Sequence, residues 1–253
     1  MNYKIYKGDC LKILDRLIYN KIKIDAVICD PPYGSTALDW DKIIDFNKMW
    51  DKLYKVLNPD CPIILFGIQP FTTKLISSNI NNYSYNLVWK KNVPTGMAQA
   101  SYRPMRYHED IIIFNHSKKS TYNPILKNRE GKGKDCYKYK HYCNPNNHIN
   151  MKKVPKLYNP DFVNPSSILE FNVVPNLLGK LHPTQKPVQL MEYLVNTYTN
   201  KGDVVLDFTM GSGSTGVACL LNGRKFIGIE KESKYYEIAK KRLKNKEYLN
   251  DNT

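Results

Sequence analysis

The fold is decided by residues 204–216, which read VVLDFTMGSGSTG. The apolar run that ends in Asp207 is typical of a short buried strand. Gly211 and Gly213 then allow the backbone to turn tightly and to approach a ligand closely. A helix follows, and the N-terminus of a helix presents unpaired N–H groups. The stretch therefore predicts a ligand-binding turn between a strand and a helix of an α/β sheet.

The next predicted strand, residues 225–230, ends in Glu230. A carboxylate in that place can bind the two hydroxyls of a ribose. The glycines of residues 211–216 satisfy G-x-G-x-x-G, which allows a NAD-dependent oxidoreductase, although a single match of this kind is weak. Asp207 precedes the turn and would repel a pyrophosphate, whereas it suits a cationic ligand. S-adenosylmethionine carries an ammonium, a sulfonium and a ribose, so it fits these two acids better than NAD.

Strand-like and helix-like runs alternate along the chain. The strands are predicted at residues 4–7, 24–29, 62–67, 85–89, 110–114, 168–171, 203–208 and 225–230. The helices are predicted at residues 11–18, 41–57, 69–80, 187–198, 214–222 and 233–246. This alternation is typical of a doubly wound α/β sheet. Residues 116–167 interrupt it without any sustained period, so we expect a main domain of residues 1–115 and 168–253 that carries an insertion.

The charge of the chain points to a polyanionic partner. The net charge is +15 over 253 residues. Residues 115–165 hold eleven basic against three acidic residues, so about half of the excess lies in about a fifth of the chain. This distribution favours nucleic-acid binding over a solvated Lys-rich loop. No apolar run approaches the roughly 20 residues of a membrane span, and the chain starts directly in a strand pattern, so we expect a cytoplasmic protein.

Residues 30–33 read DPPY and follow a predicted buried strand. Pro31 and Pro32 fix their backbone φ near about −65° and lack an N–H, so the turn is stiff and its carbonyl oxygens have few local donors. Asp30 adds a carboxylate and Tyr33 a flat ring. This set suits a planar group that bears an NH2, because the oxygens accept its hydrogens and the ring stacks on its face. The alternative is a strand-ending turn with a capping Asp.

A metal site is not predicted. The four candidate ligands in the insertion have the spacing C-x4-H-x-C-x4-H, which fits no common zinc module. They are Cys136, His141, Cys143 and His148. Ordinary polar loop residues are the preferred interpretation.

Taken in order, the motifs resemble those of the β-class DNA amino-methyltransferases, which methylate exocyclic amines of adenine or cytosine. The matching segments are Lys7-Gly8-Asp9-Cys10, Asp30-Pro31-Pro32-Tyr33, Arg106-Tyr107-His108-Glu109, His182-Pro183-Thr184-Gln185-Lys186-Pro187, Asp207–Gly213 and Glu230. The catalytic motif precedes the glycine-rich motif, which marks the β arrangement. One departure is Thr209, which stands where the family's D-P-F-M-G-S-G motif has Phe. We expect Phe208 or another residue to cover the cofactor adenine instead.

The resemblance implies a doubly wound, mostly parallel, seven-stranded Rossmann-like methyltransferase sheet with an irregular basic insertion. It implies S-adenosylmethionine as the cofactor, bound by Asp9, Cys10, Asp30, Thr184, Lys186, Asp207, Phe208, Gly211, Gly213, Ser214, Thr215 and Glu230. It implies a catalytic motif of Asp30, Pro31, Pro32 and Tyr33. We expect contacts to DNA from Tyr107, His108, Lys132, Lys134, Lys138 and Lys140.

The implied activity is site-specific methylation of the N6 amine of adenine in DNA. A motif that begins with Asp suggests adenine, because the cytosine enzymes more often begin it with Ser. The base must be flipped out of the duplex, and residues 116–167 would recognise the target. The alternatives are an N4-cytosine or RNA amino-methyltransferase, a NAD-dependent oxidoreductase, and a DNA-binding protein on an inactive methyltransferase fold. A homodimer and a cognate restriction endonuclease are partners that the sequence leaves open.

Overall fold

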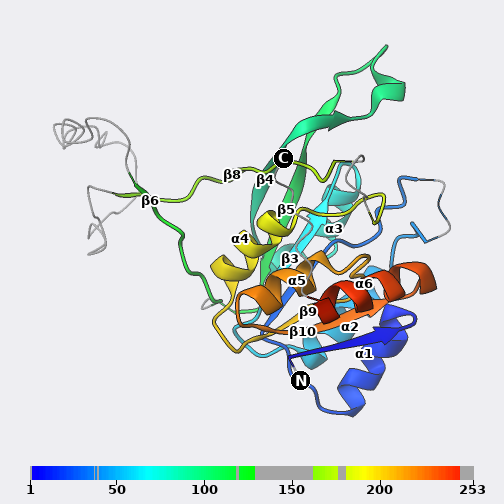
Figure 1. Cartoon of the computed structure of the whole chain (residues 1–253), viewed down its shortest axis with the longest axis vertical. Coiled ribbons are helices and arrows are strands. Elements are labelled where there is room, and N and C mark those ends of the chain that lie inside the picture. Colours follow the sequence, from blue (N-terminus) through cyan, green and yellow to red (C-terminus); the bar gives the residue numbers. More distant parts are fainter. Residues whose placement is uncertain are drawn as a thin grey trace. The chain divides into compact units, whose positions relative to one another are not determined.

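The computed structural model describes residues 2–36, 38, 40–117, 120–128, 162–175 and 181–245 (Figure 1). Its strands are β1 (Tyr3–Lys7), β2 (Ala26–Cys29), β3 (Pro62–Gly67), β4 (Tyr83–Thr95), β5 (Arg106–Asn115), β6 (Lys127–Asn128), β7 (Phe162–Val163), β8 (Ile168–Glu170), β9 (Val204–Asp207) and β10 (Lys225–Glu230). Its α-helices are α1 (Cys10–Tyr19), α2 (Phe46–Val56), α3 (Phe71–Ser77), α4 (Val188–Tyr198), α5 (Ser214–Leu221) and α6 (Ser233–Asn245). Two single turns of 3-10 helix are η1 (Ile80–Asn82) and η2 (Met97–Gln99). None of the described helices is long and apolar enough to cross a membrane.

The main sheet has the strand order β1-β10-β9-β2-β3-β5-β4-β8. Among its described strands only β5 runs against the others, because its pairs with β3 and β4 are antiparallel while all remaining pairs are parallel. The predicted doubly wound, mostly parallel fold is confirmed. The predicted count of seven strands is wrong, since eight described strands form the sheet. The edge strand β8 lies within the strand predicted at residues 168–171. It pairs with β4, where Leu169 is buried and the Trp89 indole N–H donates to the carbonyl of Phe171 at 2.8 Å.

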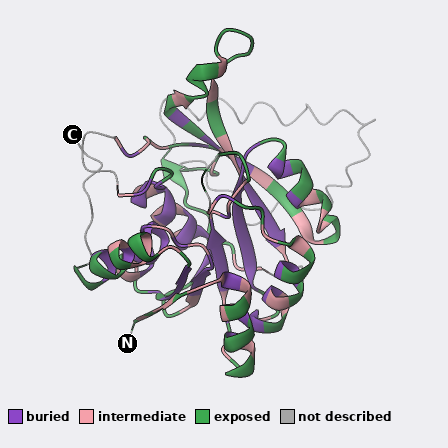
Figure 2. Ribbon diagram, turned by 90° about the vertical axis from the view of Figure 1, so that its right-hand side faces the viewer, coloured by how far each residue is buried: buried purple, intermediate pink, exposed green. Residues whose placement is uncertain are grey.

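Helices cover both faces of this sheet (Figure 1). Helices α4, α5 and α6 share one core with the sheet, and α1, α2 and α3 share the other. Along β3, Ile64 and Phe66 belong to the first core, whereas Ile63 and Leu65 belong to the second, as the alternation of side chains on a strand requires. Figure 2 shows the buried residues gathered on the strands and the exposed residues on the outer sides of the helices. A sheet buried on both faces explains the continuous apolar runs of its central strands.

The loop between β2 and α2 is held by two aspartates. The predicted helix over residues 41–57 starts too early, because α2 begins only at Phe46. Asp45 is its N-cap, the position that a short side-chain acceptor favours. Asp41 accepts hydrogen bonds of 2.7–2.8 Å from the backbone N–H groups of residues 34–36. These bonds tie the loop back to the end of the DPPY turn.

Strands β4 and β5 form a longer hairpin than the two predicted strands. The sequence pattern covered residues 85–89 and 110–114, but the pairing continues outward through Lys90 and His108 to Thr95 and Arg106. Polar residues extend the hairpin beyond the buried part of the sheet, so hydrophobic patterning does not mark its ends.

The chain separates into two compact units, residues 1–123 with 167–253 and residues 124–166. In the second unit the described strands β6 and β7 pair antiparallel. The remaining candidates for this region lie outside the described residues; they are Lys132, Lys134, Lys138, Lys140, Cys136, His141, Cys143 and His148. The predicted recognition role of residues 116–167 therefore stays a prediction.

Candidate active site

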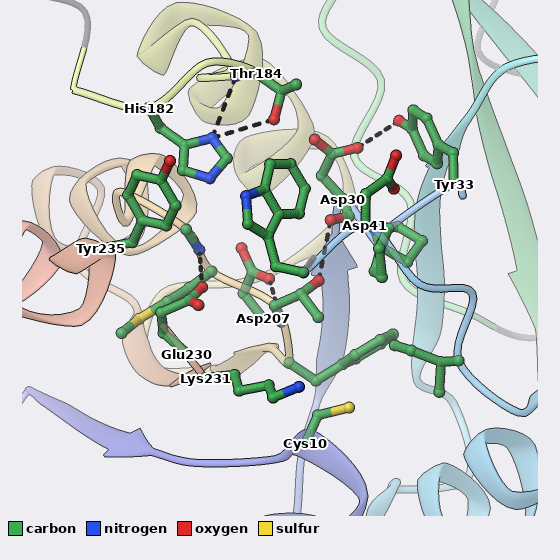
Figure 3. Close-up of a pocket in the computed structure, with 18 of the residues that line it drawn as sticks. Cys10, Asp30, Tyr33, Asp41, His182, Thr184, Asp207, Glu230, Lys231 and Tyr235 are labelled. Atoms are coloured by element: carbon green, nitrogen blue, oxygen red, sulfur yellow. Dashed lines mark hydrogen bonds between the residues drawn. The ribbon is translucent and has the colours of Figure 1, made fainter. Parts of the chain in front are cut away.

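A cavity of about 360 Å³ opens at the carboxyl ends of β1, β2, β9 and β10 (Figure 3). The carboxyl edge of an open α/β sheet is where such folds bind ligands. Most of the predicted site residues line it, namely Asp9, Cys10, Asp30, Pro31, Pro32, Tyr33, Thr184, Lys186, Asp207, Phe208, Gly211, Ser214, Thr215 and Glu230. Gly213 is not among the lining residues. Five sequence segments, around residues 9–10, 30–33, 184–186, 207–215 and 230, thus meet at one cavity.

The turn after β2 presents the Asp30 carboxylate to the cavity. One carboxylate oxygen accepts a hydrogen bond from the Tyr33 hydroxyl, and the other contacts the Lys186 ammonium (Figure 3 shows the first). Behind Tyr33 lies Phe71, with the two ring centroids 5.0 Å apart. Burial raises the pKa of Asp30, and the Lys186 charge opposes this shift. The carboxylate and the ring are therefore both fixed beside the cavity.

Lys186 lines the cavity and makes its ionic contacts on the side of the catalytic turn. Its ammonium contacts Asp30 and lies 3.3 Å from a carboxylate oxygen of Glu109 on β5. The other oxygen of Glu109 is 3.1 Å from the ammonium of Lys91 on β4. The two acids and two lysines form a buried chain of alternating charge. Sequence reasoning included Glu109 in a matching motif without a role of its own and did not single out Lys91, because only the pairing of β4 with β5 brings the two together.

The glycine-rich turn after β9 is held by Glu230. One oxygen of its carboxylate accepts from the backbone N–H of Gly211 at 2.9 Å, and the other accepts from the N–H of Glu232 at 2.7 Å. Gly211 has φ +51° and Gly213 has φ +81°, a region that side chains rarely adopt. A Cβ at Gly213 would also lie 3.1 Å from Ala239 of α6. Both glycines are thus required by the backbone of this turn, and Glu230 fixes it at the cavity wall.

Arg242 of α6 holds the same turn from behind. The side chain is 1% exposed, and one guanidinium nitrogen donates to the carbonyl of Ser212 at 2.8 Å and to its hydroxyl at 3.1 Å. A buried guanidinium bound to a backbone carbonyl is a rigid support. The sequence pattern of α6 did not reveal it, since a Lys- and Arg-rich helix is usually a solvated one.

Asp207 lies beneath the cavity and is 3% exposed. Its carboxylate accepts from the Thr215 hydroxyl at 2.6 Å and from the backbone N–H of Thr209 at 3.2 Å. Burial raises the pKa of Asp207 to about 7, so at neutral pH a nearby cation would favour its charged form. Phe208 packs in the core beneath α1 and α2 and is 1% exposed, although it borders the cavity.

The two residues after β1 also reach the cavity. Asp9 is the N-cap of α1 and accepts from the backbone N–H of Lys12 at 3.1 Å. Cys10 is buried, and burial raises the pKa of its thiol to about 12. Cys10 is therefore a neutral apolar wall at physiological pH.

Three aromatic rings that sequence reasoning did not assign lie at the Glu230 end of the cavity. The Tyr235 ring of α6 is 4.0 Å from the His182 ring, and the Trp40 ring is 5.3 Å from His182 and 6.5 Å from Tyr235. The His182 ring is oriented by Thr184, whose backbone N–H donates to Nδ1 at 3.2 Å (Figure 3). The three rings are tilted or edge-on to one another, at interplanar angles of 49–90°, and with Thr209 they line the cavity. His182 opens a motif that the sequence analysis quoted, whereas for the other two rings the sequence offered only a Trp in a polar loop.

Two predicted DNA contacts lie away from the cavity. Tyr107 and His108 are exposed on β5 and do not line it. Among the described residues no group of three or more His, Cys, Asp or Glu side chains could hold a metal ion.

Known proteins share this architecture. Residues 24–241 match the model of the family described as DNA methylase. The type II methyltransferase M.HpaI of Haemophilus parainfluenzae is 30% identical over 96% of this chain and 74% of its own length. M2.DpnII of Streptococcus pneumoniae, also a type II methyltransferase, is 30% identical over 93% of this chain and 87% of its own length.

Solved structures agree with this assignment. The crystal structure of the M1.HpyAVI–SAM complex has a TM-score of 0.64 and 26% identity, and the match covers 95% of this chain and 99% of that chain. The cytosine-N4-specific PvuII DNA methyltransferase has a TM-score of 0.63 at 15% identity over 96% of this chain and 86% of that chain, a likeness of fold alone. The family match removes the oxidoreductase alternative and confirms the resemblance found in the motifs. The chain belongs to the DNA methylase family, the S-adenosylmethionine-dependent DNA amino-methyltransferases.

Proposed function

We propose that this protein transfers a methyl group from S-adenosylmethionine to the N6 amine of adenine at a specific DNA sequence. The observation that carries the proposal is the Asp30 carboxylate, fixed at the cavity wall by Lys186 and Tyr33. The backbone carbonyl of Asp30 also accepts from the Thr209 hydroxyl at 3.0 Å. The catalytic turn is thereby joined to the glycine-rich turn that would hold the methyl donor.

The cavity residues fit S-adenosylmethionine. Glu230 would accept the ribose hydroxyls, and the rings of Trp40 and Tyr235 would lie against the adenine. Asp207 and Asp30 would face the positive groups, which compensates part of the cost of their burial. When bound there, the cofactor supplies a methyl group on a sulfonium that a nucleophile can displace. A cavity of about 360 Å³ is within the usual size of small-molecule sites.

The amine would be activated by orientation. Its lone pair is conjugated with the base and is a poor nucleophile. Asp30 and the carbonyl of Pro31 would each accept one amine hydrogen, which favours a more pyramidal nitrogen with its lone pair directed at the methyl group. As the N–C bond forms, the bond between the methyl carbon and the sulfonium sulfur would break and leave a neutral thioether. The nitrogen would become positive, and its proton would then leave to Asp30 or to water. Most of the catalysis would come from this alignment, because the amine need not lose a proton before it attacks.

The base would reach Asp30 only after leaving the duplex. Tyr33 would stack on it, since its ring is held beside the carboxylate by Phe71. Tyr107 and His108 would contact DNA outside the cavity, where the structure exposes them. The basic residues of the insertion would contact phosphates and base edges of the target. A homodimer, a cognate restriction endonuclease and a cytoplasmic location stay proposals.

Cofactor binding is expected to change the fluorescence of Trp40. The chain has three Trp residues, and Trp50 and Trp89 are only 6% and 3% exposed within the cores. Only Trp40 lines the cavity, so a nucleoside placed against it alters its surroundings. Titration of the protein with S-adenosylmethionine should change the emission, and Trp40→Phe should remove most of that change. An undiminished change in Trp40→Phe would show that the cofactor lies elsewhere.

The proposed function is tested by identifying the methylated base. Cells that lack adenine methylation would express the protein, and their DNA would be analysed by long-read sequencing and by mass spectrometry of its nucleosides. We expect N6-methyladenine in one recurrent sequence. N4-methylcytosine in place of N6-methyladenine would overturn the adenine assignment but keep the family assignment. DNA from cells expressing Asp30→Ala is the matched control.

A further inference from the structure

We infer that Lys186 is a positioning residue for methyl transfer, whose ammonium holds the Asp30 carboxylate in place between the cofactor turn and the target base. The inference rests on the proposed role of Asp30. It departs from the motif-based prediction, which placed Lys186 among the residues that bind the cofactor.

The contacts of Lys186 are on the side of the catalytic turn. Its ammonium contacts Asp30, lies 3.3 Å from Glu109 and is 4.8 Å from the centroid of the Phe66 ring on β3. Its side chain is 8% exposed, so these charges meet with little water between them. The following residue, Pro187, caps α4 and restricts the backbone of Lys186 to an extended shape. The conformation of Lys186 is therefore restricted, and its ammonium contacts one oxygen of the Asp30 carboxylate.

The charge around Asp30 is balanced only when Lys186 is present. The ionisable groups that face the Asp30 carboxylate are Lys186, Glu109, Tyr33, Asp207 and Cys29. Of these, Lys186 alone carries a positive charge. Lys91, whose side chain is 2% exposed, balances the negative charge of Glu109. Its ammonium does not contact Asp30. Among the described residues, Asp30 without Lys186 would face only acids and neutral groups, which favours its protonation.

Two lysines of the same buried chain provide a matched comparison. Lys186→Met and Lys91→Met each remove one buried ammonium that contacts Glu109, but only the first removes the partner of Asp30. We expect Lys186→Met to lower the single-turnover rate on unmethylated plasmid DNA by about 10- to 100-fold, the range of one lost charge-assisted hydrogen bond. Lys91→Met should lower it several times less. The Kd for S-adenosylmethionine, measured by calorimetry, should stay within about threefold in both.

The pH dependence of the transfer rate gives a second test, in which two substitutions are expected to move the acidic limb in opposite directions. Asp30 must be ionised to accept the amine hydrogens, so the rate falls at low pH as Asp30 becomes protonated. Lys186→Met removes a positive charge and raises the pKa of Asp30, which moves this acidic limb to higher pH. Glu109→Gln removes a negative charge and lowers the pKa of Asp30, which moves the limb to lower pH. Lys186→Arg keeps the positive charge and should keep the acidic limb near its wild-type position. This variant is measured in place of Lys186→Met if the latter does not fold.

The inference is overturned by either of two results. In the first, Lys186→Met weakens cofactor binding by more than about tenfold and leaves the rate at saturating cofactor unchanged, as for a residue of the cofactor site. In the second, the Lys186 and Lys91 variants lose activity equally and no acidic limb moves, as for a purely structural role. The adenine assignment fails separately: wild-type protein that methylates no adenine contradicts the proposed function, whatever the Lys186 variants do.

Discussion

Asp30→Ala is expected to abolish methyl transfer, with a loss of at least about a thousandfold in single-turnover rate, while cofactor affinity stays within a few-fold. The variant keeps Glu230 and the glycine-rich turn, which would hold the nucleoside, but loses the acceptor that orients the amine. It also leaves Lys186 with Glu109 alone, and breaking a buried ion pair costs about 3–5 kcal/mol of the free energy of unfolding. The rate and the cofactor Kd should therefore be measured well below the unfolding temperature of the variant.

A second substitution separates the chemistry from the fold. Asp30→Asn keeps the shape of the side chain and one acceptor oxygen, so it should unfold at a higher temperature than Asp30→Ala and still transfer methyl groups far more slowly than wild type. Asp51→Ala is the matched surface control, because Asp51 is 59% exposed and pairs only with Lys55 of the same helix. Wild-type rates in Asp30→Ala would refute the catalytic assignment.

Glu230→Gln is expected to raise the Kd for S-adenosylmethionine by about 10- to 100-fold, which corresponds to about 1.4–2.8 kcal/mol. The carboxylate would accept the ribose hydroxyls, and it already accepts from the N–H groups of Gly211 and Glu232. An amide supplies only one acceptor atom, so its NH2 would face one of these donors. The variant should lose both a charged partner of the ribose and part of the support of the turn.

The matched control for this substitution is Glu237→Gln. Glu237 lies on α6 with its side chain 66% exposed and pairs with Lys240 at 3.8 Å. Calorimetric titration of both variants should show the loss only for Glu230. Transfer at saturating cofactor should be reduced far less than in Asp30→Ala. An unchanged Kd in Glu230→Gln would place the ribose elsewhere in the cavity.

The acids at the carboxyl ends of strands were predictable from the sequence. Asp30, Asp207 and Glu230 each end a buried apolar run, and parallel strands place such positions together at one edge. Gly211 and Gly213 were predictable because only glycine tolerates the backbone of that turn. The pattern along the chain marked eight strands, including residues 168–171 where the three-residue β8 lies, and the wrong count of seven came from the family resemblance.

The partners of these residues were not predictable. Lys91 and Glu109 meet because β4 pairs with β5 in one register, and a shift by one residue would place them on opposite faces of the sheet. Lys186 belongs to a recognised motif, yet its contacts depend on where the segment before α4 crosses the sheet. Trp40 reaches the cavity through a loop whose path is set by the hydrogen bonds of Asp41 to residues 34–36. The positions of these partners depend on tertiary packing, which a local sequence pattern does not reveal.

The hydroxyl of Thr209 has a consequence for how the strands of this chain could be connected. It joins the end of β9 to the carbonyl of Asp30, and it also lies 2.9 Å from the thiol of Cys29, across 179–180 positions of sequence. The turn that would hold the methyl donor and the turn that would hold the target amine are thus aligned by contacts between neighbouring strands. The long segment of chain that connects them does not set this alignment. A polypeptide that ran through the same strands in another order, with the glycine-rich motif first, would preserve this alignment. In this chain the order of the two motifs is therefore not what aligns them.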